Sequence, residues 1–206
     1  MKGMRPLENH EVRKILNYFK NLPTQSPKGQ HLFPVRNRSL FVIGLQTGLR
    51  IGEICQLKIG DVYGTDNKVS PVIRLKKKQT KSKESRIVPL SNTAQRAIRE
   101  CIAWQREYFG HIEMDNPLFP TRTKTHFSQG SASEVITRIF RACNIKDPVN
   151  THSLRKTFAT KIYQKTGNLR VCQELLGHKD LTSTQKYIGV TYTEMNEAVN
   201  AIGLAY

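Results

Sequence analysis

The sequence has 206 residues, with 33 Lys and Arg against 16 Asp and Glu, which gives a formal net charge of +17 at pH 7. This excess of positive charge indicates a polyanionic partner, either nucleic acid or an anionic membrane surface. No apolar run approaches the ~20 residues of a membrane-spanning helix, so we expect a cytoplasmic protein that binds nucleic acid rather than a membrane. The four cysteines are widely spaced and there is no Gly-rich loop of the Walker type, so we expect neither a metal nor a nucleotide cofactor.

The first part of the chain predicts three helices. Residues 8–20 place apolar side chains at helical spacing behind Asn9, a candidate N-cap. After a connection that contains Pro, Gln, Ser and Gly, residues 36–47 are apolar almost all round, which is typical of a helix at the centre of a domain. Gly48 then fits a helix C-terminus, and residues 51–57 begin the next helix.

An arginine stands on the turn between the second and third of these helices. The run Thr47-Gly48-Leu49-Arg50-Ile51-Gly52-Glu53-Ile54 bounds Arg50 with two glycines. A guanidinium held close to the backbone in this way can grip a tetrahedral anion with two N–H groups. Considered alone, Arg50 is equally compatible with a surface arginine that pairs with Glu53.

The middle of the chain predicts a β-hairpin with a basic connection. Residues 70–75 and 85–90 are runs with β-branched side chains, separated by a polar segment. Residues 76–86 contain six basic side chains and one acidic one. Considered alone, this connection is compatible with a solvated loop that touches phosphate groups without specificity.

Two further helices read as scaffold. Residues 92–109 repeat small and apolar side chains as an amphipathic helix does, and a second stripe runs from Val135 to Cys143. Neither segment carries chemistry that the sequence identifies.

The run Asn150-Thr151-His152-Ser153-Leu154-Arg155 follows Pro148. A helix that begins near Thr151 presents His152 and Arg155 on one face of its first turn. At that end of a helix the unpaired backbone amides and the helix dipole favour phosphate. Considered alone, a histidine with an arginine three residues later occurs often by chance.

The last distinctive stretch pairs a histidine with a tyrosine. Leu175-Leu176-Gly177-His178 contains a glycine that can end one helix, and the Thr/Ser cluster at 182–184 can begin another. Tyr187 follows His178 by nine residues. Considered alone, such a pair is more often the ordinary packing of a half-buried tyrosine.

Together, these four stretches resemble the boxes of the tyrosine recombinases, the phage-integrase family, over residues 47–190. The resemblance implies an α+β, mainly α-helical fold with a small β-hairpin, the tyrosine recombinase catalytic-domain fold of DNA breaking-rejoining enzymes. It implies a catalytic domain at 1–190 and a C-terminal tail helix at 191–206. Members usually carry a further N-terminal core-binding domain. We expect this chain to lack it, either as an excised fragment or as a short recombinase like those of the fimbrial-switch type.

The resemblance also implies roles for individual residues. Tyr187 is the nucleophile, and His152 assists its proton transfer. Arg50 and Arg155 bind the scissile phosphate, and Glu53 supports the site by orienting it. These roles follow from the position of each residue in its box.

Two further roles complete the implied site. His178 donates to a non-bridging oxygen, and a hairpin lysine protonates the leaving 5′ oxygen. Counting back seven residues from Val88, as in the family, selects Lys81, with Lys78 and Lys83 as close neighbours.

The implied function is that of a site-specific DNA recombinase, or integrase, which cleaves and rejoins DNA through a 3′-phosphotyrosyl intermediate. The alternatives are a type IB topoisomerase-like enzyme and a non-catalytic DNA-binding remnant of an integrase. The implied partner is double-stranded DNA, with a homotetramer formed on DNA through the tail and a monomer without DNA. Lys156 stands where many members carry a second histidine, so the local charge of the site is left open.

Overall fold

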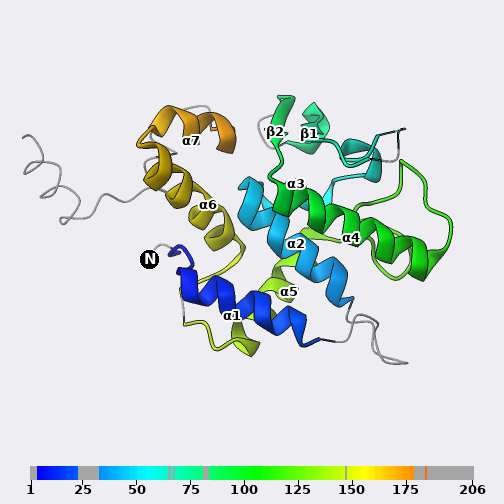
Figure 1. Ribbon diagram of the computed structural model, residues 1–206, viewed down its shortest axis with the longest axis horizontal. Coiled ribbons are helices and arrows are strands. Elements are labelled where there is room, and N and C mark those ends of the chain that lie inside the picture. The colour runs from blue at the N-terminus through cyan, green and yellow to red at the C-terminus, as the bar shows by residue number, and fades with distance from the viewer. Residues whose placement is uncertain are drawn as a thin grey trace, which may run out of the picture.

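The computed structural model describes residues 4–22, 33–64, 66, 68–80, 84–146, 148–178 and 184 (Figure 1). Helices make up most of this part of the chain, and a two-stranded antiparallel sheet lies beside them. The predicted mainly helical fold with a small β-hairpin is confirmed. In chain order the elements, with η for a short 3₁₀ helix, are α1 (Asn9–Lys20), α2 (Pro34–Thr47), α3 (Ile51–Cys55), η1 (Ile59–Asp61), β1 (Val72–Leu75), η2 (Lys77–Gln79), β2 (Arg86–Pro89), α4 (Asn92–Phe109), α5 (Gln129–Ala142), α6 (Thr151–Thr166) and α7 (Leu169–Leu176).

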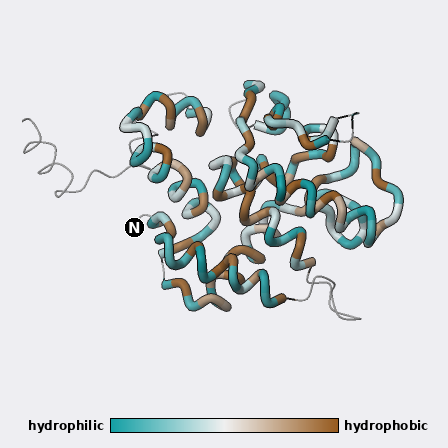
Figure 2. The backbone as a smooth tube through the Cα atoms, viewed as in Figure 1, coloured by the Kyte–Doolittle hydropathy of each residue, from teal (hydrophilic) through white to brown (hydrophobic). Residues whose placement is uncertain are grey.

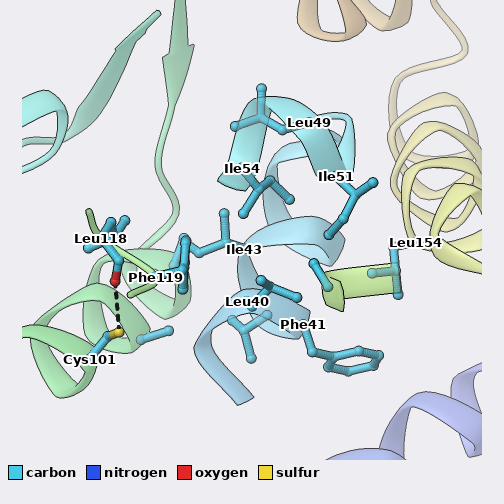
Figure 3. Packing of buried hydrophobic residues seen from close by; sticks show 14 of the residues in the cluster. Leu40, Phe41, Ile43, Leu49, Ile51, Ile54, Cys101, Leu118, Phe119 and Leu154 are labelled. Atoms are coloured by element: carbon cyan, nitrogen blue, oxygen red, sulfur yellow. Dashed lines mark hydrogen bonds between the residues drawn. The ribbon is translucent and has the colours of Figure 1, made fainter. Parts of the chain in front are cut away.

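Helix α2 lies at the centre of the hydrophobic core, as its apolar composition predicts. Pro34 is its first residue, a position where the missing N–H of proline has no intrahelical partner to lose. Leu40, Phe41 and Ile43 are fully buried, and each such burial contributes about 2 kcal/mol. Helix α2 packs against α4 and α6, and Figure 3 shows Leu154 of α6 among the side chains around it. The turn after α2 is therefore held on a rigid base.

Helix α1 shows one correction to the predicted helix boundaries. It begins at Asn9, so its N-cap is Glu8 rather than Asn9. The Glu11 carboxylate accepts the Glu8 N–H at 2.8 Å and so satisfies a donor at the helix start. Ile15 and Phe19 are buried on the side that faces α2. Figure 2 shows hydrophilic and hydrophobic residues alternating along the helices, as expected of amphipathic helices around a shared core.

The predicted β-hairpin is confirmed, and its register places an arginine on the inner face. Ile73 pairs with Val88 and Leu75 pairs with Arg86. Ile73, Leu75 and Val88 are buried, whereas Ile87 is 63% exposed. Because side chains alternate between the two faces of a strand, Arg86 lies on the same face as Val88.

The helices α6 and α7 form the end of the described fold. Asn150 caps α6 by accepting the His152 N–H at 2.8 Å, so the helix predicted near Thr151 is confirmed. Helix α7 packs on α6 through a small apolar cluster. It ends at Gly177, as predicted. The tail helix expected at 191–206 lies outside the described residues.

None of the helices in the described ranges combines the length and the apolar composition that a bilayer crossing requires.

Candidate active site

A cavity of about 720 Å³ opens between the turn before α3, the base of the β-hairpin and the start of α6. Its lining includes Arg50, Glu53, Lys78, His152 and Arg155. These residues come from segments that are far apart in the sequence, so tertiary packing brings them together. Two separate sequence motifs, one with Arg50 and Glu53 and the other with His152 and Arg155, therefore contribute to the wall of one cavity.

Arg50 is held in place by Glu53. The Glu53 carboxylate accepts the backbone N–H of Arg50 at 2.8 Å and its Nη1 at 3.2 Å. The Glu53 side chain is 3% exposed and that of Arg50 is 28% exposed. A buried carboxylate thus holds an arginine that still reaches the cavity.

The turn that carries Arg50 requires a glycine. Gly48 has a φ of 61°, in the left-handed region. A β-carbon at this position would collide with the ring of Phe158. Glycine therefore allows the chain to turn from α2 into α3 while α6 packs against it.

Arg155 is almost fully buried, at 1% exposure, and bridges two parts of the backbone. Its Nη1 donates to the carbonyl oxygen of Gly48, and its Nη2 donates to that of Leu176 at 2.8 Å. A buried guanidinium needs such partners, because leaving a buried charge unpaired costs several kcal/mol. Gly48 lies two residues before Arg50, and Leu176 lies two residues before His178. Arg155 therefore joins the segment that carries Arg50 to the segment that carries His178.

His178 lies directly against Arg155. Its Nε2 is 2.8 Å from Nη2 of Arg155, and its Nδ1 is 2.9 Å from the hydroxyl oxygen of Thr184. A guanidinium can only donate, so Nε2 accepts and the imidazole proton lies on Nδ1, which donates to Thr184. Arg155 therefore sets the tautomer of His178 in this arrangement.

Arg86 of β2 is a further cation at this site, and the sequence motifs do not single it out. Its Nη2 lies 2.9 Å from the Glu53 carboxylate, and its Nη1 donates to the Leu176 carbonyl at 2.8 Å. Burial lowers the pKa of Arg86, and the charge of Glu53 acts in the opposite direction. The one sequence signal is its position two residues before Val88, on the inner face of a strand.

The base of the hairpin is anchored by buried polar groups. Nε2 of Gln79 donates to the Asp61 carboxylate at 2.6 Å and to the Gln56 carbonyl at 3.1 Å. The hydroxyl group of Thr80 donates to the Glu84 carbonyl at 2.8 Å and accepts the Glu84 N–H at 3.1 Å. These contacts hold Gln79 and Thr80, which line the cavity, and tie Thr80 to Glu84.

The structure places Lys78 and Lys156 but not the other two residues considered for the site. Lys81 and Tyr187, the candidates for proton donor and nucleophile, lie outside the described residues. Lys78 lies on the cavity wall. Lys156 donates to the Met4 carbonyl at 3.0 Å and so braces α6 against the start of the chain.

Comparison with known proteins identifies the family. A family model described as the phage integrase family matches residues 5–194. This chain belongs to the phage integrase family. The membership predicted from the sequence motifs is therefore confirmed.

Curated relatives agree with this family. The tyrosine recombinase XerD of Halalkalibacterium halodurans is 27% identical to this phage-integrase chain over 193 residues, which cover 94% of the chain and 60% of the relative. A tyrosine recombinase of Pseudothermotoga lettingae is 30% identical over 211 aligned residues, covering 98% of the chain and 68% of the relative.

Solved structures of recombinases share the fold. The XerH site-specific recombinase, bound to a palindromic difH substrate in a post-cleavage complex, is 26% identical with a TM-score of 0.76, covering 97% of this chain and 54% of that one. The XerA recombinase gives a TM-score of 0.74 at 22% identity and covers 100% of this chain and 66% of that one. The predicted tyrosine recombinase fold is confirmed. This phage-integrase chain spans about half to two thirds of the length of these proteins.

Proposed function

We propose that this chain holds the catalytic domain of a site-specific DNA recombinase, which cleaves and rejoins double-stranded DNA through a 3′-phosphotyrosyl intermediate. The main support is the cavity wall, where Arg50, His152 and Arg155 lie together although their motifs are far apart in the sequence. We assign residues 1–190 to the catalytic domain and residues 191–206 to a C-terminal tail.

The proposed step is a transesterification, which needs a nucleophile, a proton donor and a clamp for developing charge. The phenolic oxygen of Tyr187 bonds to phosphorus while the bond from phosphorus to the 5′ oxygen breaks. His152 assists removal of the phenolic proton, and Lys81 gives a proton to the departing oxygen. The 3′-phosphotyrosyl bond keeps the energy of the broken ester, so the 5′ hydroxyl of a second strand can reverse the step.

Arg50, Arg155 and His178 form the proposed charge clamp on the non-bridging oxygens. Arg50 reaches the cavity with the Glu53 carboxylate behind it. A phosphate oxygen between Arg155 and His178 takes the place of their 2.8 Å contact. For His178 to donate to that oxygen, its Nε2 must gain a proton, because Nε2 is the acceptor in the present arrangement.

Double-stranded DNA suits the charge of the chain, since phosphate contacts from Lys and Arg supply much of the affinity of DNA-binding proteins. The similar XerH recombinase was solved bound to its DNA substrate. We propose that the protein is monomeric without DNA and assembles on DNA as a homotetramer, with the tail of one protomer on its neighbour. Because its proposed substrate is DNA, we place its activity in the cytoplasm.

A nicked suicide substrate that carries the flanks of the native locus tests this function. Cleavage next to the nick releases a short oligonucleotide and traps the protein on the DNA in a form that survives SDS. An adduct together with strand exchange between two sites supports a recombinase. On a separate, supercoiled plasmid, relaxation without exchange would instead indicate a topoisomerase. The absence of any adduct on the nicked substrate would contradict the proposed chemistry.

A further inference from the structure

We propose, on the basis of the function proposed above, that Arg86 is a positioning residue for DNA cleavage. It joins the carboxylate that holds Arg50 to the helix end that carries His178. These two groups are far apart in the sequence, one on α3 and the other at the end of α7, and Arg86 has a hydrogen bond to each of them.

The first contact is with Glu53. One carboxylate oxygen faces Nη1 of Arg50 at 3.2 Å, and the other faces Nη2 of Arg86 at 2.9 Å. The Glu53 side chain is 3% exposed and that of Arg86 is 13% exposed, so this pair is shielded from water. Charge-assisted hydrogen bonds are strong in such surroundings. Arg86 therefore limits the rotation of the carboxylate that orients Arg50.

The second contact is with the end of α7. The N–H of His178 donates back to the Gln173 carbonyl at 3.1 Å, as in a Schellman ending. The carbonyl of Leu176 accepts hydrogen bonds from both Arg86 and Arg155, each at 2.8 Å. Two guanidinium groups thus lie at the negative end of a helix dipole, where positive charge is stabilising.

The fit between Arg86 and the turn is close. A β-carbon at Gly177 would collide with Nη1 of Arg86 and would lie 3.0 Å from its Cδ. The arginine side chain therefore lies flat against the glycine that precedes His178. If Arg86 shifts, the turn at Gly177 loses this contact, and the imidazole of His178 changes its position.

Arg86 is not among the described residues that line the cavity. It therefore acts through Glu53 and the ending of α7 rather than on the substrate. Misplacing catalytic groups by about 1 Å can slow a reaction by roughly 100-fold. DNA affinity depends instead on phosphate contacts spread over a basic surface. The loss of Arg86 should therefore slow cleavage on saturating DNA and leave the dissociation constant little changed.

The test compares Arg86→Met, Arg86→Lys and the control Arg138→Met in the full chain, on the nicked substrate. Arg138→Met also removes one positive charge, which makes it a matched control. The Arg138 side chain is 67% exposed, and in the described contacts it pairs only with the nearby Glu134. The Met variant of Arg86 should cleave roughly 100-fold more slowly at saturating DNA. The Lys variant should be intermediate, because lysine keeps the charge without the planar fork. Arg138→Met should cleave like the wild type.

Amide hydrogen exchange supplies a readout that needs no activity. Gly177 and His178 donate their amides within the ending of α7, so both should exchange faster in Arg86→Met, while α4 keeps its protection. A folded Met or Lys variant with wild-type cleavage and wild-type exchange would overturn the positioning role. If the wild-type protein forms no adduct, the proposed function fails. Exchange at Gly177 and His178 then tests only whether Arg86 anchors the ending of α7, with faster exchange supporting that anchoring and unchanged exchange overturning it.

Discussion

The guanidinium of Arg86 occupies the space in which a β-carbon at Gly177 would stand. Gly177 ends α7 at a φ of 62°, and Gly167 ends α6 at the same φ of 62°. Apart from Gly167 itself and its two neighbours in the chain, no described atom lies within 4 Å of a β-carbon built at Gly167. The two glycines thus share a backbone conformation and differ in what surrounds them, which makes them a matched pair for mutation.

Replacing each glycine by alanine should separate backbone strain from steric conflict. Gly167→Ala should lower the free energy of unfolding by about 1 kcal/mol, the cost of the left-handed conformation. Gly177→Ala should lower it by about 2 to 4 kcal/mol, because it adds the collision with Arg86. Urea unfolding of the two variants measures the difference.

The control for this pair is Gly177→Ala in an Arg86→Met background. There the penalty should fall toward that of Gly167→Ala, since the colliding guanidinium is gone. Equal penalties for the two alanine variants in the wild-type background would show that Arg86 does not pack against the turn.

Glu11 should make stability depend on pH. Its carboxylate accepts two hydrogen bonds from Arg5, at 2.7 and 2.6 Å. The hydrogen bond from Arg5 lowers the pKa of Glu11, although burial acts against it. Because the folded pKa lies below the unfolded value of about 4.3, the stabilisation is complete above that value and is lost as the pH falls through the folded pKa.

Glu11→Gln tests this dependence. At pH 7 the variant should have a free energy of unfolding about 1 to 2 kcal/mol below that of the wild type, and this gap should shrink toward pH 3. Urea titrations of both proteins at the two pH values measure it. A gap of the same size at both pH values would mean that the charge of Glu11 is not what stabilises the fold.

Much of the fold and of the site follows from local sequence patterns. The amphipathic pattern predicts a helix at 92–109, and α4 has those bounds. Ser91 precedes it and accepts the Ala94 N–H, a local contact that marks a helix start. Arg50 and His152 were found from motifs whose neighbours along the chain place them on helix starts.

Contacts between distant segments were not predictable in this way. Arg86 bonds to Leu176, which is 90 residues away, so no local pattern indicates the pairing. The same holds for Arg155, which was predicted as a phosphate ligand and whose guanidinium faces two backbone carbonyls and His178. The physical reason is that burial makes the terminal nitrogens of each guanidinium bond to whatever acceptors the packing brings near.

Lys81 should be separable from its neighbours by a change in the leaving group. A general acid matters because the 5′ oxygen leaves poorly without a proton, and sulfur in its place removes that need. Lys81→Ala should therefore be severely slow on ordinary DNA and largely restored on a 5′-bridging phosphorothiolate substrate. Single-turnover cleavage of both substrates measures the restoration.

Two comparisons make this prediction specific. Arg50→Ala should stay slow on the sulfur substrate, because its proposed task is to stabilise charge on the non-bridging oxygens. Lys78→Ala should lose mainly DNA affinity, as a phosphate contact does. Restoration at Lys78 instead of Lys81 would move the proton donor to the cavity wall.

DNA binding should weaken steeply with salt. With a net charge of +17, the protein should release many counterions on binding, and six or more phosphate contacts imply a loss of affinity of about 1,000-fold between 50 and 200 mM salt. Lys78→Ala should reduce the slope by roughly one contact. Fluorescence anisotropy across a salt series measures both slopes, and an affinity that hardly changes with salt would argue against a phosphate-dominated interface.

Covalent attachment through Tyr187 is the most direct test of the recombinase chemistry. The measurement is a denaturing gel of wild type and Tyr187→Phe after incubation with labelled, nicked DNA. The phenylalanine variant lacks only the hydroxyl oxygen that becomes bonded to phosphorus. We predict an SDS-resistant adduct for the wild type and none for the variant, with both proteins binding the DNA equally well. An adduct that persists in Tyr187→Phe would contradict the account, because another residue would then be the nucleophile.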